Sequence, residues 1–93
     1  MIKTFRSEEA ELLCRERVSS RRFRSFAGVA YRKLFELDHA KELRDLQKAP
    51  GNRLEKLSGD RKGQYSIRVN DQWRVCFTWH DGNSYDVEIT DYH

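Results

Sequence analysis

The sequence predicts one α+β domain of two layers, in which helices cover one face of a mainly antiparallel sheet of four to five strands. Before Pro50, apolar residues recur three, four or seven positions apart, which is the spacing of a helix face. After Pro50 they alternate with polar residues, as they do in strands. The chain has 93 residues, a length that suits a single domain over residues 1–93.

The first expected element is a short N-terminal strand at residues 2–5, where apolar and polar side chains alternate. Ser7 ends this strand and is placed to cap a helix. The residues that follow are acidic, which suits the positive end of the helix dipole: Glu8, Glu9 and Glu11.

A second helix is predicted from Arg21, because its apolar residues form one stripe. The stripe consists of Phe23, Phe26, Ala27, Ala30, Leu34 and Leu37. The charged residues between the apolar ones are expected mostly to face solvent: Arg22, Arg32, Lys33 and Glu36. Asp38 is a candidate cap for a short third helix, or for a bent continuation of the second.

Three consecutive antiparallel strands are predicted after the loop at Pro50. Their apolar positions are Tyr65, Ile67 and Val69, then Trp73, Val75, Phe77 and Trp79, then Tyr85, Val87 and Ile89. Turns are expected at residues 70–72 and 81–83, the second with the Asp-Gly pair of hairpins. Residues 54–57 are expected to add an edge strand, and the alternation makes the tryptophans core residues.

The strand register follows from keeping apolar residues opposite apolar residues across each hairpin. Pairing Val69 with Trp73 and Ile67 with Val75 places Arg68 opposite Arg74, on the face away from the helices. Pairing Trp79 with Tyr85 and Val75 with Ile89 then places Thr90 opposite Arg74. Tyr92 follows on the same face and His93 lies at its rim, so Arg68, Arg74, Tyr92 and His93 are expected to converge.

Two arginines directly opposite each other in a sheet repel by roughly 0.2–1 kcal/mol, which favours a shared anion. Phosphate fits, because a guanidinium offers a planar fork of donors to its oxygens. An alternative remains open, in which Glu88 and Asp86 on the last strand neutralise the pair. His93 can exchange a proton near neutral pH, and an acid beside phosphate-binding arginines suits RNA cleavage.

The charge distribution favours a polyanionic partner, although a solvated surface of mixed charge is the alternative. Residues 1–33 hold nine basic and four acidic side chains, and residues 48–74 hold seven and three. Residues 75–93 hold four acidic side chains and no Lys or Arg. No apolar run reaches the length of a membrane span, so we expect a cytoplasmic protein without membrane contact.

Thiol and metal chemistry are not expected. Cys14 and Cys76 lie far apart and lack the neighbours that activate a nucleophile. Zinc ligands normally come in close pairs along the chain. Among the cysteines and histidines, Cys76 and His80 are the only two that stand two to five residues apart, so a zinc site is not expected. His39 is expected on a helix surface, and no cofactor is predicted.

Several segments in this order resemble the HigB-like branch of the RelE/ParE superfamily of toxins. They are the residues 57–60 (LSGD) with Gly63, YSIRVNDQWRVCF at 65–77, DG at 81–82, and DYH at 91–93. The resemblance covers nearly the whole chain and implies a RelE-like two-layer fold. It also implies a toxin of a type II toxin-antitoxin system: a metal-independent endoribonuclease, or mRNA interferase, that cuts messenger RNA on the ribosome and arrests translation and growth.

The resemblance implies roles and partners as well. Arg74 and Arg68 would bind and stabilise the phosphate, and His93 would transfer a proton. Tyr92 would position RNA or its phosphate, and Asp91 would anchor the strand end or orient a neighbour. The cognate antitoxin would be a HigA-like helix-turn-helix protein, and operator DNA would be bound only through the antitoxin complex.

The edge strand departs from the family pattern, because many relatives carry a histidine and a lysine where this chain has Glu55 and Ser58. Glu55 is a candidate substitute base. Lys56 or Lys62 would restore the charge, and together with Arg61 and Arg68 they are the candidate RNA-binding residues. Two other functions remain open: a non-catalytic module that binds RNA or the ribosome, and a partner subunit of a transcription-regulating complex.

Overall fold

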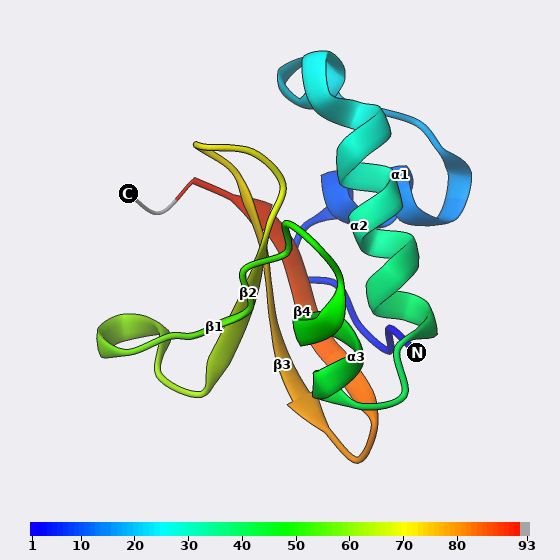
Figure 1. The fold of residues 1–93 in the computed structure, drawn as a ribbon. Coiled ribbons are helices and arrows are strands. Elements are labelled where there is room, and N and C mark those ends of the chain that lie inside the picture. Colours follow the sequence, from blue (N-terminus) through cyan, green and yellow to red (C-terminus); the bar gives the residue numbers. More distant parts are fainter. Residues whose placement is uncertain (92–93) are drawn as a thin grey trace.

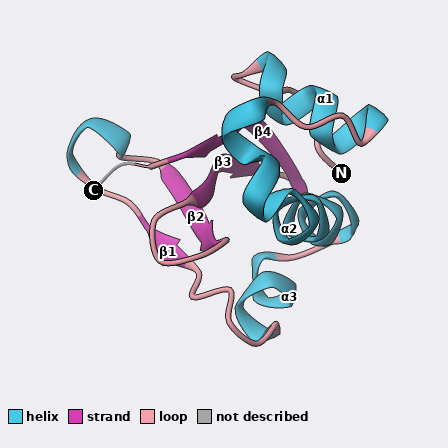
Figure 2. Ribbon diagram, turned by 90° about the horizontal axis from the view of Figure 1, so that it is seen from above, coloured by secondary structure: helices cyan, strands magenta, loops and turns pink. Residues whose placement is uncertain are grey.

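The computed structural model describes residues 1–91 and has the predicted α+β architecture. A four-stranded antiparallel sheet has the order β1-β2-β3-β4, with β1 at Glu55–Lys56, β2 at Gln64–Arg68, β3 at Arg74–His80 and β4 at Asn83–Thr90. The helices α1 (Glu8–Glu16), α2 (Ala27–His39) and α3 (Leu43–Lys48) precede it in the chain. Figure 1 shows α1 and α2 beside the sheet, and Figure 2 shows the helices from above.

The first residues form two isolated parallel bridges with β4 rather than a full strand. Ile2 bridges Ser84 and Phe5 bridges Val87. Ser7 caps α1 as predicted, since its hydroxyl accepts a hydrogen bond from the Ala10 amide at 3.1 Å. The N-terminal segment therefore extends the sheet beside β4 and leads directly into α1.

The second predicted helix is divided in two. Its first part, η1 (Arg21–Phe26), is a 3₁₀ helix, and α2 begins only at Ala27. Phe26 has φ −128° and ψ 19° at this junction, which is outside the helical conformation. The break lets both Phe23 and Phe26 pack on Trp73, with ring centroids 5.6 and 5.4 Å from it.

Two expectations about α2 are wrong. Asp38 caps no helix: it lies inside α2, and its Oδ1 accepts a hydrogen bond from the Ile2 amide at 2.7 Å. Glu42 and Asp45 instead form a capping box at the start of α3. Lys33 does not face solvent but is 9% exposed, because its Nζ donates to the buried side chain of Asn52.

The sheet register is confirmed near Arg74 and wrong further along β4. Arg68 pairs with Arg74, and Arg74 with Thr90. Tyr85, however, pairs with Thr78 instead of Trp79. The cause is a bulge at Asp86, which has a left-handed φ of 53° and turns Tyr85 to the other face from Val87.

The core lies between the helices and the inner face of the sheet. It combines Leu34 and Leu37 of α2 with Ile67, Val75 and other apolar strand residues. Trp73 and Trp79 pack against this core, as predicted. The edge strand is also present but short, since only Glu55 and Lys56 of the expected residues 54–57 pair with β2.

Candidate active site

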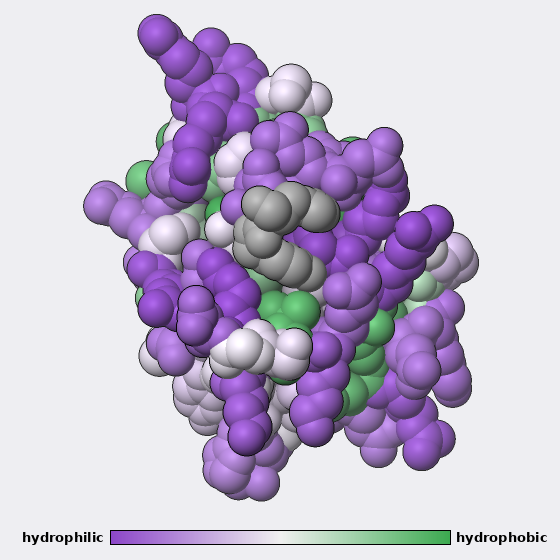
Figure 3. Space-filling view, turned by 90° about the vertical axis from the view of Figure 1, so that its left-hand side faces the viewer, coloured by the Kyte–Doolittle hydropathy of each residue, from purple (hydrophilic) through white to green (hydrophobic). Residues whose placement is uncertain are grey.

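The candidate site lies on the face of the sheet away from the helices. Alternate positions of β2, β3 and β4 direct polar side chains to this face. They are Ser66 and Arg68 of β2, Arg74, Cys76 and Thr78 of β3, and Glu88 and Thr90 of β4. Figure 3 shows this side of the molecule, which is mostly hydrophilic.

Arg74 is held in place rather than projecting openly into solvent. Its residue exposure is 7%. Its Nε donates to the Ser66 hydroxyl at 2.7 Å, and its Nη2 donates to the Arg53 carbonyl. Nη1 lies 3.7 Å from Glu55 Oε1. The guanidinium therefore has a fixed orientation, with the Nη1 edge turned toward a carboxylate that is itself exposed.

Arg68 is more accessible than the arginine opposite it. Its side chain is 31% exposed, and its Nη2 pairs with Asp71 in the turn at 2.5 Å. The hydrogen bond from Arg68 lowers the pKa of the Asp71 carboxyl below its ordinary value. The predicted pairing of the two arginines is therefore confirmed, but the turn and the loop before β1 hold them differently, and Arg74 is much less open than Arg68.

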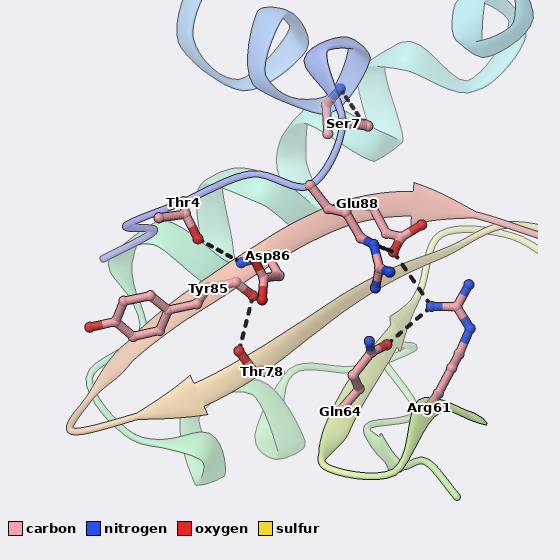
Figure 4. A network of polar contacts seen from close by, with 10 residues as sticks. Thr4, Ser7, Arg61, Gln64, Thr78, Tyr85, Asp86 and Glu88 are labelled. Carbon is pink, nitrogen blue, oxygen red and sulfur yellow. Dashed lines mark hydrogen bonds and ion pairs between the residues drawn. The ribbon is translucent and has the colours of Figure 1, made fainter. Parts of the chain in front are cut away.

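Glu88 pairs with other arginines than Arg68 and Arg74, whose charge the alternative interpretation expected it to neutralise. Its Oε2 lies 3.5 Å from both Arg6 and Arg61. Arg61 also donates to Gln64 Oε1 at 3.0 Å, as Figure 4 shows. These side chains line a polar hollow of about 360 Å³ together with Asp60. Sequence reasoning missed Arg6, because the N-terminal segment carries no local sign that it lies against β4.

The other predicted RNA-binding residues do not all share one face. Lys56 is exposed, but it pairs with Tyr65, whose ring stacks on Phe77 of the core. The register thus places Lys56 on the opposite face of the edge strand from Glu55. Lys62 is exposed in the loop after η2 (Gly59–Arg61), next to Arg61.

Asp91 ties the end of β4 to the turn between β2 and β3. Its Oδ2 accepts a hydrogen bond from Gln72 Nε2 at 2.9 Å. The role of Asp91 in the site stays a prediction. Tyr92 and His93 lie outside the described residues, so their predicted convergence with Arg74 stays a prediction.

Thiol chemistry has no support at this site. Burial raises the pKa of the Cys76 thiol to about 11, which leaves very little of the nucleophilic thiolate at neutral pH. In residues 1–91, no group of three or more His, Cys, Asp or Glu side chains is arranged to hold a metal ion. His39 stacks on Phe35 at the surface of α2, and none of the described helices is long and apolar enough to cross a membrane.

Comparisons with known sequences identify the family. The model for the RelE-like toxin of type II toxin-antitoxin system HigB matches residues 15–93. Endoribonuclease HigB of Proteus vulgaris is 32% identical over 93 residues, which cover all of both chains. Toxin HigB-1 of Vibrio cholerae is 50% identical over 58 residues, 62% of this chain, and the match spans only 61% of that relative.

Solved structures show the same fold at lower sequence identity. The heterotetrameric YoeB-YefM toxin-antitoxin complex from Staphylococcus aureus contains a chain with a TM-score of 0.61 and 22% identity, covering 100% of this chain and 98% of that one. A YoeB dimer from the same organism gives a TM-score of 0.55 at 22% identity, with 99% and 94% covered. Together with the family model, the fold and the full-length match show that the chain belongs to the family of RelE-like toxins of the type II toxin-antitoxin system HigB.

Proposed function

We propose that the chain is an mRNA interferase, an endoribonuclease that cuts messenger RNA on the ribosome and so inhibits translation and growth. Membership of a toxin family and full-length similarity to a protein named Endoribonuclease HigB support this function. The observation that carries it is the fixed guanidinium of Arg74, opposite Arg68 and 3.7 Å from the Glu55 carboxylate. Two cations and one base beside each other match the needs of phosphodiester cleavage.

The proposed reaction is attack of an RNA 2′-hydroxyl on the adjacent phosphorus. Glu55 takes the proton of the hydroxyl, the new oxygen–phosphorus bond forms, and the bond to the 5′ oxygen of the next nucleotide breaks. The products are a 2′,3′-cyclic phosphate and a 5′-hydroxyl, which receives its proton from His93. Each proton has a side chain to carry it, so the proposed route needs no metal or cofactor.

Arg74 would stabilise the charge that develops on the phosphoryl oxygens. Its bonds to Ser66 and the Arg53 carbonyl orient it before RNA arrives, so little reorganisation is needed in the transition state. Arg68 is the more exposed of the two and would make the first contact with the phosphate. Tyr92 would position the RNA, while Asp91 holds the strand end.

The basic residues near η2 would guide the flanking message. Arg61 and Lys62 lie beside the polar hollow on the site's side of β2, and Lys56 would contact RNA that passes around the edge strand. These contacts are with phosphates, so RNA binding should weaken steeply as salt increases.

The partners would be the ribosome with its message and a cognate antitoxin. The solved complex of a toxin of this fold with its antitoxin supports the antitoxin. We propose a HigA-like antitoxin with a helix-turn-helix domain, through which alone the complex would bind operator DNA. Since ribosomes and message are its targets, the toxin would act in the cytoplasm.

Cleavage on ribosomes programmed with a defined message tests the proposal. Primer extension should detect new 5′ ends with the wild type, and Arg74→Lys should reduce their rate of appearance about a hundredfold, because a lysine cannot present two donors in a plane. Glu55→Gln should also lower this rate, because the amide that replaces the carboxylate cannot take the proton of the 2′-hydroxyl. Arg44→Ala, at an exposed position on α3, serves as the matched control and should cleave normally.

Two results would contradict the proposal. If translation stops while the message gains no new 5′ ends, the chain is a non-catalytic module that binds RNA or the ribosome. If Arg74→Lys cleaves as fast as the wild type, the site lies elsewhere on the molecule.

A further inference from the structure

The buried polar side chains of residues 1–91 are mostly joined in one series of contacts. They are Lys33, Asn52, Ser66, Arg74 and Ser84. Lys33 of α2 donates from Nζ to Asn52 Oδ1, and the same Nζ lies 3.8 Å from Glu36 Oε2. The helical layer therefore holds the loop that leads to β1, from the side of the molecule away from the candidate site.

Asn52 is held on every side. Its Nδ2 donates to the Leu46 carbonyl at 3.1 Å, and its amide donates to the Ala49 carbonyl at 3.3 Å. Its own carbonyl accepts from the Arg68 amide at 2.6 Å. A fully buried asparagine with all its polar groups bonded is a rigid point in the structure.

The residue after this point makes the contact with Arg74. Arg53 has a left-handed φ of 45°, and its carbonyl accepts a hydrogen bond from Arg74 Nη2. Ser66 Oγ holds the Nε edge of the same guanidinium. Ser66 of β2 thus fixes the Nε side of the Arg74 guanidinium. The Arg53 carbonyl fixes its Nη2, and Arg53 directly follows Asn52, which is hydrogen-bonded to Lys33.

We propose that Lys33 is a positioning residue for Arg74, acting through Asn52 and the Arg53 carbonyl. The inference rests on the proposed function, because it assigns a task to Arg74 in cleavage. Lys33 lies in the helical layer and is 9% exposed, so it acts on the reaction through the loop and not by contact with RNA. A misplacement of about 1 Å at a reacting group is enough to cost up to roughly a hundredfold in rate.

A double-mutant cycle separates positioning from a general loss of stability. Lys33→Met removes the donor but keeps the length of the side chain, and it should lower the single-turnover cleavage rate on programmed ribosomes about tenfold. In an Arg74→Ala background the same change should lower the remaining rate less than twofold, because the group that it positions is gone. Arg32→Met, at an exposed neighbouring position on α2, is the matched control and should leave the rate unchanged.

A second measurement reports the position of Arg74 without activity. Its Nε–H is buried against Ser66, so its NMR signal should exchange slowly with solvent in the wild type and at least about tenfold faster in Lys33→Met. If Lys33→Met fails to fold at the assay temperature, Lys33→Gln, whose amide still donates, takes its place in both experiments with smaller changes in the same direction.

Equal rate losses from Lys33→Met in the two backgrounds, or an unchanged Arg74 signal, would overturn the positioning role. The proposed function fails differently, since it requires Arg74→Ala alone to reduce cleavage. A large effect of Arg74→Ala with an additive cycle would leave the function standing and remove the inference.

Discussion

Replacing each arginine of the cross-strand pair should change stability by very different amounts. Arg74→Ala leaves the Ser66 hydroxyl, which is fully buried, without its charged donor, a loss of about 1.5–3 kcal/mol. The Arg53 carbonyl belongs to an exposed residue and can bond water instead, so its loss adds about 0.5–1 kcal/mol. The sum is about 2–4 kcal/mol of unfolding free energy.

Arg68→Ala is the matched control, because it removes the same side chain from the facing position. Arg68 pairs with Asp71, whose side chain is 99% exposed, and an ion pair of this kind contributes about 0–1 kcal/mol. For a domain of this size 1 kcal/mol corresponds to roughly 4–8 °C in Tm. We therefore expect a fall of at least about 8 °C for Arg74→Ala and of no more than about 8 °C for Arg68→Ala.

Urea denaturation followed by circular dichroism gives both free energies, and thermal unfolding gives both Tm values. Equal losses in the two variants would refute the reasoning, because they would show that Arg74 is no more firmly held than Arg68. The result also sets the temperature for cleavage assays, which must keep Arg74→Ala folded.

Further predictions concern positions outside the arginine pair. Cys76 should react with iodoacetamide at neutral pH at least about a hundredfold more slowly in the folded chain than in urea, since burial raises its pKa to about 11; mass spectrometry of the labelled chain checks this. Hydrogen bonds from the amides of Glu42 and Lys41 lower the pKa of Asp45 in the folded chain. The ionised carboxylate therefore stabilises α3 fully above the ordinary carboxyl pKa of about 3.9, and this stabilisation is lost as the pH falls through the lower pKa of the folded state. The amide chemical shifts of α3 should follow this titration, and a titration at or above the ordinary value would contradict it. Gly82→Ala should destabilise the chain by about 1–2 kcal/mol, because φ is +78° and a Cβ would lie 3.3 Å from the Lys41 carbonyl oxygen. Gly28→Ala in α2 meets no atom within 4 Å and should stabilise the chain by about 0.5–1 kcal/mol. Urea denaturation of the two variants must therefore give changes in unfolding free energy of opposite sign.

The parts of the fold that sequence predicted are those governed by local periodicity. Alternation in β2 and β3 is uninterrupted, so it fixed Ile67 opposite Val75 and Arg68 opposite Arg74. In β4 the spacing of Tyr85 and Val87 also fits simple alternation, which predicts that both lie on the same face. The bulge at Asp86 places them on opposite faces, and the spacing of apolar residues does not reveal it. An aspartate adopts the left-handed conformation more readily than most residues, but this preference is too weak to locate a bulge alone.

The parts that sequence could not predict depend on contacts between distant residues. Lys33 is buried because Asn52, nineteen positions later, accepts its hydrogen bond, and nothing near either residue indicates the other. The burial of Arg74 likewise depends on the Arg53 carbonyl, which reaches it only because the loop before β1 turns through a left-handed residue. The face that carries Arg74 was therefore predictable, while its degree of enclosure was not.

The pairing of the first residues with β4 governs the order in which the chain can fold. Thr4 Oγ1 accepts a hydrogen bond from the Asp86 amide at 2.8 Å, across 82 positions of sequence. During synthesis the N-terminal segment thus waits for almost the whole domain before its partners exist, and contacts this remote slow folding. A nascent chain whose β4 is still inside the ribosome lacks the last strand of the candidate active site, so this site cannot assemble before β4 has left the ribosome.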